Sequence, residues 1–306
     1  MTKGTAILGT ASLVVPRFAK SLEFAVHDTI IAALTNAGLS SLADVDTVMT
    51  SASDTLDGIM VATRSEMAGS AGKSYLHVPS SAGHALSAAA TLIEAGQAET
   101  LLLVGWGEGS KFGVADTRAI QADPFYARPV GATPAALAAL QAQFLVGSGY
   151  VSIDVAEAYS ARMVARLGLG QARGVGPTWL RTGWCDGVVA IVLASADMHP
   201  NAVRICDYGS SFRPYTPQSD SADELDPACW VAQALPALPV ASDIIEASAP
   251  TPICEARAAM ALGNGADWEA RLNPSGGGAA AYFGNATGLR GLAAMAAALG
   301  EGQTGC

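Results

Sequence analysis

The sequence predicts an α/β fold in which helices pack in layers on a largely parallel sheet. Short apolar segments alternate with longer segments of helical periodicity, which is the pattern of βαβ units. The composition agrees, because 50% of the 306 residues are hydrophobic, only 14% are charged and 33 are glycines. Small residues let helices approach a sheet closely, and a chain of this length has room for a large core or two fused half-domains.

The N-terminal part of the chain predicts strands and helices in alternation. We expect strands at 5–9, 45–49, 75–78 and 100–105, and helices at 22–37, 64–71 and 81–95. Gly38 and Gly96 follow two of these helices, where a glycine suits the helix C-terminus. The apolar run from Thr100 to Gly105 is typical of a strand that is covered on both faces.

The segment from about 112 to 180 breaks this alternation. Three prolines interrupt it before the helices expected at 135–146 and 153–167. It also carries six arginines, Arg118, Arg128, Arg162, Arg166, Arg173 and Arg181. A strand is expected at 185–194, and 203–206 begins a second pass of the same topology, which continues through 253–262 and 273–281 to a last helix at 286–299.

The charge and cysteine content exclude several classes of protein. The formal net charge of −10 argues against nucleic acid or an anionic membrane as a general partner. No apolar run reaches the roughly 18 residues of a membrane span, and the N-terminus does not resemble a signal peptide, so we expect a cytoplasmic protein. The five scattered cysteines and four widely spaced histidines favour neither a disulfide framework nor a metal site.

One segment near the C-terminus has a distinctive pattern. Leu272–Gly288 contains Asn273-Pro274-Ser275-Gly276-Gly277-Gly278 and, further on, Tyr282-Phe283-Gly284-Asn285-Ala286-Thr287-Gly288. This resembles the N-P-S-G-G…G-H-P-x-G-A-T-G segment of thiolases, especially those of the sterol-carrier-protein type.

Five further segments extend the resemblance over most of the chain, in the family's order. Val78–Ala85 and the following Leu92–Glu99 and Val104–Ser110 are similar to the pattern C-A-S-G-x-x-A…I-x-x-G-x-A-D…V-V-G-x-E. Asp186–Leu193 is similar to the D-G-A-A-A segment, and Cys254–Ala258 to the N-E-A-F-A or H-D-A-F block.

The resemblance implies a five-layer αβαβα fold made of two βαβαβαββ halves, with a shortened C-terminal half. The halves would be 1–196, including the loop region at about 112–180, and 197–306. It also implies a homodimer, or a hetero-oligomer with a thiolase or an OB-fold partner. Acyl-CoA would be the ligand, and no other cofactor is expected. The arginines of the loop region would meet CoA phosphates, or else lie on solvated helix faces.

The nucleophilic cysteine of the family is missing. A gapless count places Pro79 at its position, and a shift of one residue places Ser80 there. A serine needs an adjacent base to act as a nucleophile, so Ser80 is either catalytic or a structural helix N-cap. His84 lies one helical turn further on, as a substrate-binding candidate or a packing residue.

The histidine of the G-H-P motif is also missing. Tyr282 is the best candidate for its place, and Phe283 is the alternative. A phenol transfers protons when its pKa is perturbed, and thiolase-like steroid side-chain aldolases, which lack the cysteine, are thought to use tyrosines. Tyr282 is therefore either a proton-transfer residue or a core aromatic.

The remaining candidates come from the matched motifs. Cys254 and Glu255 lie where the family has the residues that shape its oxyanion region. Cys254 is either a relocated nucleophile at a helix N-terminus or a small apolar residue. Asn273, Gly277 and Asn285 are candidates for substrate binding, although the glycine run also suits close backbone packing.

The sequence thus predicts a thiolase-like, acyl-CoA-handling protein without the catalytic cysteine and histidine. It would act as a non-condensing subunit or acyl-CoA binder beside a thiolase or ketosynthase partner. The alternative is an acyltransferase or retro-aldolase on CoA thioesters that uses Tyr282, Glu255 and Ser80, because an oxyanion hole alone still polarises a thioester. A purely structural or interaction role remains a third interpretation, and ordinary thiolase activity is rejected.

Overall fold

The chain folds into two compact units, each assembled from three separate segments. In the computed structural model, the described residues are 4–53, 59–79, 81–111, 128–169, 176–209, 225–234, 242–249, 251–263 and 268–306. Unit 1 consists of Met1–Gly109, Cys185–Tyr208 and Phe283–Leu299. Unit 2 consists of Ser110–Trp184, Gly209–Tyr282 and Gly300–Cys306.

The described strands of unit 1 form one six-stranded sheet in the order β3-β2-β4-β5-β1-β6. Their bounds are β1 Thr5–Val15, β2 Thr47–Ser51, β3 Ser74–His77, β4 Thr100–Glu108, β5 Asp186–Ser195 and β6 Val203–Ile205. β2 pairs in parallel with β3 and β4, whereas β5 is antiparallel to β4 and β1, and β6 is antiparallel to β1. The expectation of a largely parallel sheet is therefore corrected: β1 to β4 share one direction, but the two late strands reverse it.

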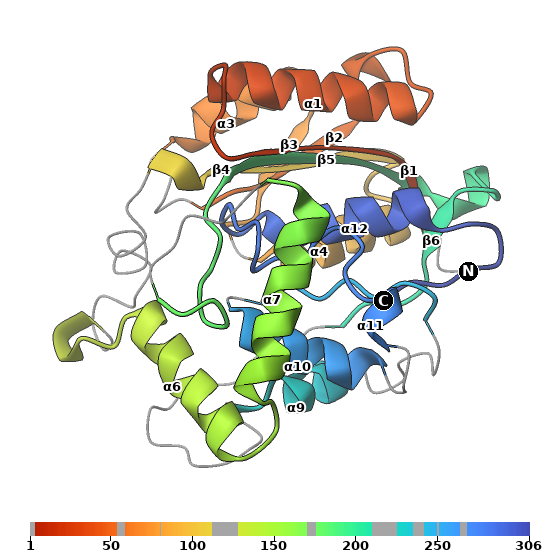
Figure 1. Cartoon of the computed structure of the whole chain (residues 1–306). Helices are drawn as coiled ribbons and strands as arrows, with labels where there is room; N and C mark the ends of the chain where they lie inside the picture. Colours follow the sequence, from red (N-terminus) through yellow and green to blue (C-terminus); the bar gives the residue numbers. More distant parts are fainter. Residues whose placement is uncertain are drawn as a thin grey trace. The chain divides into compact units, whose positions relative to one another are not determined.

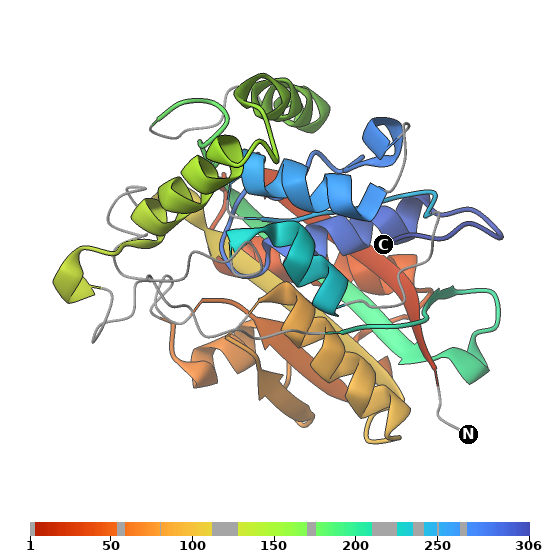
Figure 2. The same cartoon turned by 90° about the horizontal axis from the view of Figure 1, so that it is seen from below.

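Helices cover both faces of this sheet (Figure 1, and from below in Figure 2). α1 (Leu22–Asn36) and α3 (Val61–Met67) lie on one face, and α4 (Ala82–Glu94) and α12 (Thr287–Ala298) on the other. The central strands are consequently buried on both sides, and all ten residues of β5 are buried. On the α1 face, residues alternate along the strands to form a core, which includes Leu102, Val104, Trp106, Val188, Ala190 and Val192.

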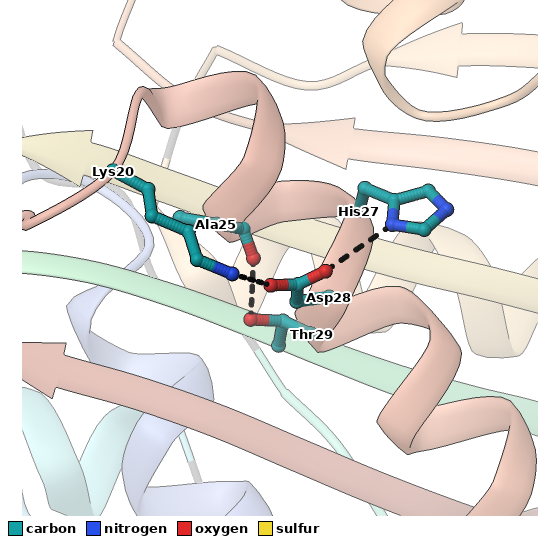
Figure 3. Close-up of polar contacts among 5 residues, drawn as sticks. All are labelled: Lys20, Ala25, His27, Asp28 and Thr29. Atoms are coloured by element: carbon teal, nitrogen blue, oxygen red, sulfur yellow. Dashed lines mark hydrogen bonds and ion pairs between the residues drawn. The ribbon is translucent and has the colours of Figure 1, made fainter.

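The exposed face of helix α1 carries polar contacts, both within the helix and with Lys20, which precedes it (Figure 3). Lys20 Nζ lies 2.9 Å from Asp28 Oδ2, and His27 Nδ1 lies 3.4 Å from Asp28 Oδ1. The hydrogen bond from Lys20 lowers the pKa of the Asp28 carboxyl. On the buried side, the Thr29 hydroxyl donates to the Ala25 carbonyl at 2.7 Å, which satisfies it within the helix.

The C-terminal strands and helices do not begin a new sheet where the sequence suggested one. β6 was expected to open the second pass of the topology, but it pairs with β1 at the edge of the first sheet. α12 also belongs to unit 1. The two units are defined by compactness, whereas the predicted halves 1–196 and 197–306 are defined by a repeated topology. The units therefore do not test the halves, which stay a prediction.

Unit 2 is mainly helical in its described part. It contains α6 (Pro134–Gly147), α7 (Ile153–Leu167), α9 (Pro227–Ala234), α10 (Pro252–Gly263) and α11 (Trp268–Arg271). Its extended segments form isolated bridges, Trp184 with Tyr282, Ile244 with Gly305 and Ile245 with Leu272. The buried side chains of α7 and α10 pack together with those of the bridging segments, and Tyr159, Met163, Ile245, Ala256 and Leu272 belong to this core.

Helix α9 is fastened to α10 by one buried carboxylate. Arg257 donates to both oxygens of Asp226, from Nε at 2.8 Å and from Nη2 at 2.6 Å. Asp226 Oδ1 also accepts from the Ala228 amide at 2.9 Å, and the Arg257 guanidinium lies 4.9 Å from the ring centroid of Tyr150. This bidentate pairing fixes α9 more firmly than a single surface ion pair would. No helix in the described part of the chain is long and apolar enough to cross a membrane.

The Phe283 ring packs directly against Gly187 in the sheet of unit 1. A Cβ atom on Gly187 would lie 2.6 Å from Cγ and Cδ1 of the Phe283 ring. Gly187→Ala is therefore expected to destabilise the protein by about 1–3 kcal/mol, the usual cost of overpacking. Thermal or urea unfolding measures the change.

The control for this variant is Gly83→Ala. Gly83 lies inside α4, and the nearest atom to a Cβ placed there is 4.0 Å away. Alanine is the better helix former, so this variant should keep or raise the stability. Equal stability of the two variants would contradict the packing of Phe283.

Candidate functional site

The sequence-predicted site residues fall into two groups, one in each unit. Those in unit 2 are Cys254, Glu255, Asn273, Gly277 and Tyr282. Those in unit 1 are His84 and Asn285. Ser80 lies outside the described residues.

Asn285 holds the backbone on both sides of position 80. Its Nδ2 donates to the Pro79 carbonyl at 2.7 Å, and its own carbonyl accepts from the Ala82 amide at 3.0 Å. The N-cap residue of α4 is Ser81, which corrects the reading of Ser80 as the N-cap. Half-buried His84 turns back toward Ser81, with Nδ1 3.2 Å from its hydroxyl oxygen. Asn285 thus acts on the shape of this turn.

The buried cysteines are poor nucleophiles. Burial raises the pKa of Cys254 to about 11 and that of Cys185 to about 12. Cys254 Sγ also lies 3.2 Å from Gln141 Oε1, to which the thiol donates. Both thiols are therefore protonated at neutral pH, whereas the thiolate is the reactive form. All five cysteines are free, and the described residues contain no group of three His, Cys, Asp or Glu side chains that would hold a metal ion.

Glu255 lies at the centre of a buried polar cluster. Its side chain is 0% exposed. Oε1 accepts from the Tyr159 hydroxyl at 2.5 Å and from Asn273 Nδ2 at 3.2 Å. Oε2 accepts from the amides of Ala249, at 3.2 Å, and Ala279, at 2.7 Å. Four donors surround one carboxylate, so its charge is satisfied inside the protein.

Tyr159 and Asn273 complete the cluster. Asn273 Nδ2 also donates to the Tyr159 hydroxyl at 2.6 Å, and Asn273 Oδ1 accepts from the Ala247 amide at 2.6 Å. Burial, and then the adjacent Glu255 carboxylate, hold the pKa of Tyr159 well above its ordinary value of 10.0. Tyr159 therefore stays protonated and acts as a donor. The backbone of Asn273 has φ 44, a left-handed conformation that asparagine tolerates.

The glycine run wraps directly around this carboxylate. A Cβ atom on Gly277 would collide with Glu255 Oε1 and lie 2.9 Å from Asn273 Nδ2. A Cβ atom on Gly278 would collide with the Ser248 hydroxyl and lie 3.2 Å from Glu255 Oε2. The glycines thus allow the backbone to close over a buried charge. This is the packing role that the sequence left open for Gly277.

Tyr282 lies beside Trp184 at the end of the same loop. The two rings meet edge to face, with centroids 4.9 Å apart and planes at 83°. The backbones also pair, because the Tyr282 amide donates to the Gly183 carbonyl at 2.6 Å. Tyr282 is half-buried, whereas Trp184 is 5% exposed, and its indole nitrogen has no hydrogen-bond partner in the described part of the protein. Phe283, the alternative occupant of the histidine position, is 1% exposed and lies in unit 1.

The arginines of the loop region have mixed surroundings. Arg118 and Arg173 lie outside the described residues, as does the side chain of Arg128. The other three arginines contact groups of unit 2 itself. Arg162 pairs with Glu269 at 2.7 Å, Arg166 donates to the carbonyl groups of Leu272 and Asn273, and Arg181 donates to the Gly176 carbonyl. Their role toward CoA phosphates stays a prediction.

Two side chains of this region were not among the candidates from the sequence. Tyr159 lies 96 residues before Glu255 and in no matched motif. Its only sequence signal is a spacing of three and four residues from Ala156 and Met163, which places it on the same buried face of the helix. Trp184 lies two residues before the matched block that begins at Asp186, and a tryptophan so close to a buried strand would have been the clue.

Comparison with solved structures identifies the fold. An aldolase described as Ltp2-ChsH2(DUF35) superposes with a TM-score of 0.69 at 15% identity, over 94% of this chain and 88% of that chain. An acetyl-CoA acetyltransferase from Syntrophomonas wolfei superposes with a TM-score of 0.67 at 12% identity, over 97% and 92% of the two chains. No family model and no curated protein matches the sequence. The thiolase-like α/β fold predicted from the sequence is therefore confirmed.

Thiol labelling tests the description of the cysteines. With iodoacetamide at about pH 8, exposed Cys206 should be alkylated in the native protein, because the reagent can reach it. Cys185 and Cys254 should react only after denaturation, because burial shields them and raises their pKa. Peptide mass spectrometry of native and denatured samples reads both results from one digest. Rapid alkylation of native Cys254 would restore it as a candidate nucleophile.

Proposed function

We propose that this chain binds a coenzyme A thioester and serves acyl-CoA metabolism without covalent cysteine catalysis. The observation that carries this proposal is the state of the two buried thiols, which are protonated and enclosed within a thiolase-like fold. The sequence resemblance to thiolases suggests that the ligand is an acyl-CoA. A tyrosine in place of the family's histidine removes the usual partner of a thiolate.

The main form of the proposal is a non-condensing subunit or acyl-CoA binder. It would work with a thiolase or ketosynthase partner, or with an OB-fold companion, and its own copies would form a homodimer. The similar aldolase structure supports association with another chain, since its description joins Ltp2 with ChsH2(DUF35).

The second candidate is retro-aldol cleavage of a 3-hydroxyacyl-CoA. Two observations favour it: Tyr282 is half-buried rather than enclosed, and an aldolase is among the similar structures. A base would take the proton of the 3-hydroxyl group as the C2–C3 bond breaks. C3 leaves as an aldehyde or ketone, and the electron pair stays on C2 as a thioester enolate. Protonation at C2 gives the shortened acyl-CoA, and Tyr282 would transfer one of these protons.

An acyltransferase with Ser80 as its nucleophile receives no comparable support. Asn285 donates to the Pro79 carbonyl, and half-buried His84 turns toward Ser81 rather than offering a described base to residue 80. Cys254 is likewise not proposed as a nucleophile, because its thiol is protonated and donates to Gln141.

Calorimetric titration with CoA and with acyl-CoA thioesters tests the binding proposal. We expect saturable binding of the CoA thioester and weaker binding of the matching pantetheine thioester, which lacks the nucleotide phosphates. In the same preparation, the condensation of two acetyl-CoA molecules should yield no product. Absence of CoA binding by the full-length protein, alone and with a candidate partner, would reject the proposal. Thiolytic or condensing turnover would reject it equally.

Tyr282→Phe separates the two forms of the proposal. Phenylalanine keeps the ring that packs on Trp184 and removes only the hydroxyl group, so stability and CoA binding should be preserved. If the chain is an aldolase, aldehyde or ketone release from a 3-hydroxyacyl-CoA should fall by about 10²–10⁴-fold, the usual contribution of a proton-transfer group.

The matched control is Tyr208→Phe. The Tyr208 hydroxyl donates to Glu94 at 3.1 Å within unit 1, and Tyr208 is not among the candidate residues. This variant should leave the release of the carbonyl product unchanged. Unaltered turnover of Tyr282→Phe would remove Tyr282 from the chemistry.

A further inference from the structure

The loop that ends in Tyr282 is held by contacts that begin at Glu255. The Ala279 amide donates to Glu255 Oε2 at 2.7 Å. The carbonyl of the same residue accepts from the Gly183 amide at 2.7 Å. The Gly183 carbonyl in turn accepts from the Tyr282 amide at 2.6 Å. A continuous set of hydrogen bonds therefore leads from the carboxylate of Glu255 to the backbone of Tyr282.

Glu255 has no capacity left for a substrate proton. An ionised carboxylate offers about four lone-pair sites, and the described residues already direct four donors at those of Glu255. The side chain is also 0% exposed. A general base must come within hydrogen-bond reach of the proton that it removes. The enclosed geometry of Glu255 does not offer that reach.

The same four donors come from segments that are far apart in the sequence. Tyr159 belongs to α7, Ala249 to the segment before α10, and Asn273 and Ala279 to the loop after α11. Hydrogen bonds to a charged group are stronger than those between neutral groups, so the carboxylate fixes these segments relative to one another. The glycines at 277 and 278 let the loop follow the carboxylate closely.

We propose that Glu255 is a positioning residue, which fixes the 276–279 loop and through it the orientation of Tyr282 against Trp184. Tyr159 and Asn273 support it by holding Oε1. This inference rests on the proposed role of Tyr282 for its catalytic consequence. Its structural content, the geometry of the Tyr282–Trp184 ring pair, does not depend on any ligand.

The substitution that tests it is Glu255→Gln. The glutamine amide group has the same shape, but its NH₂ end cannot accept from the amides or the hydroxyl that now donate to the carboxylate. We expect a lower unfolding temperature and, well below that temperature, a changed orientation of Tyr282. The near-ultraviolet circular dichroism of the Tyr282–Trp184 pair reports this orientation, and the spectra of Trp184→Phe and Tyr282→Phe identify its band.

The expected result is loss of most of that band in the folded Glu255→Gln protein. Where the protein is an aldolase, kcat should also fall by about 100-fold, the effect of a misplaced reacting group, with a smaller change in KM. Glu269→Gln is the matched control. Glu269 is an exposed carboxylate paired with Arg162, and its variant should keep both the band and kcat.

An unchanged ring-pair band in folded Glu255→Gln would overturn the proposal, whatever the activity. If activity fell while the band stayed unchanged, Glu255 would act on the substrate instead. Should Glu255→Gln fail to fold, Tyr159→Phe decides, because it removes one donor and should give a partial loss of the same band. Lack of CoA binding in the unsubstituted protein rejects the proposed function but leaves this measurement intact.

Discussion

The burial of one carboxylate, Glu255, is the constraint on which the described loops of unit 2 depend. A charged group taken out of water is costly unless donors surround it. Here the donors are the hydroxyl of Tyr159, the side-chain amide of Asn273 and two backbone amides. Each donor must stay in place, because the loss of any one would leave the buried charge with an unmet hydrogen bond in a low-dielectric interior. The left-handed backbone of Asn273 and the absence of side chains at 277 and 278 follow from the same demand.

The contacts around Glu255 do not depend on the catalytic groups that the sequence resemblance would lead one to expect. The contacts that shape the frame are made by backbone amides, glycines and enclosed polar side chains. None of them requires a cysteine nucleophile or an imidazole. The ring of Tyr282, our candidate for the position of the imidazole, is supported by Trp184 and its backbone by Gly183. Under the proposed function, these contacts would hold Tyr282 in place whatever chemistry occurs there.

The sequence predicted elements well where the local pattern was strong. The runs at 100–105 and 185–194 became β4 and β5, because strands buried on both faces are apolar throughout. β1 extends to Val15, beyond the expected residue 9, because its second part is only half-buried and lacks that signal. β6 was expected to begin a second pass of the topology, but it pairs with β1 in the first sheet. A strand of three residues carries no information on its partner, and its pairing with β1 joins segments almost 200 residues apart.

The candidate site shows a second limit of sequence reasoning. The motifs named Glu255, Asn273 and Gly277 as separate candidates, and the structure brings all three together in one cluster. They did not reveal Tyr159, because a partner supplied by another helix leaves no trace in a local motif. Nor did they reveal what Glu255 does. Whether a carboxylate moves protons or holds a loop depends on how many donors reach it and on its access to substrate. Since the described donors already engage both oxygens of Glu255, our proposal assigns proton exchange with a ligand to the half-buried phenol of Tyr282 rather than to this carboxylate.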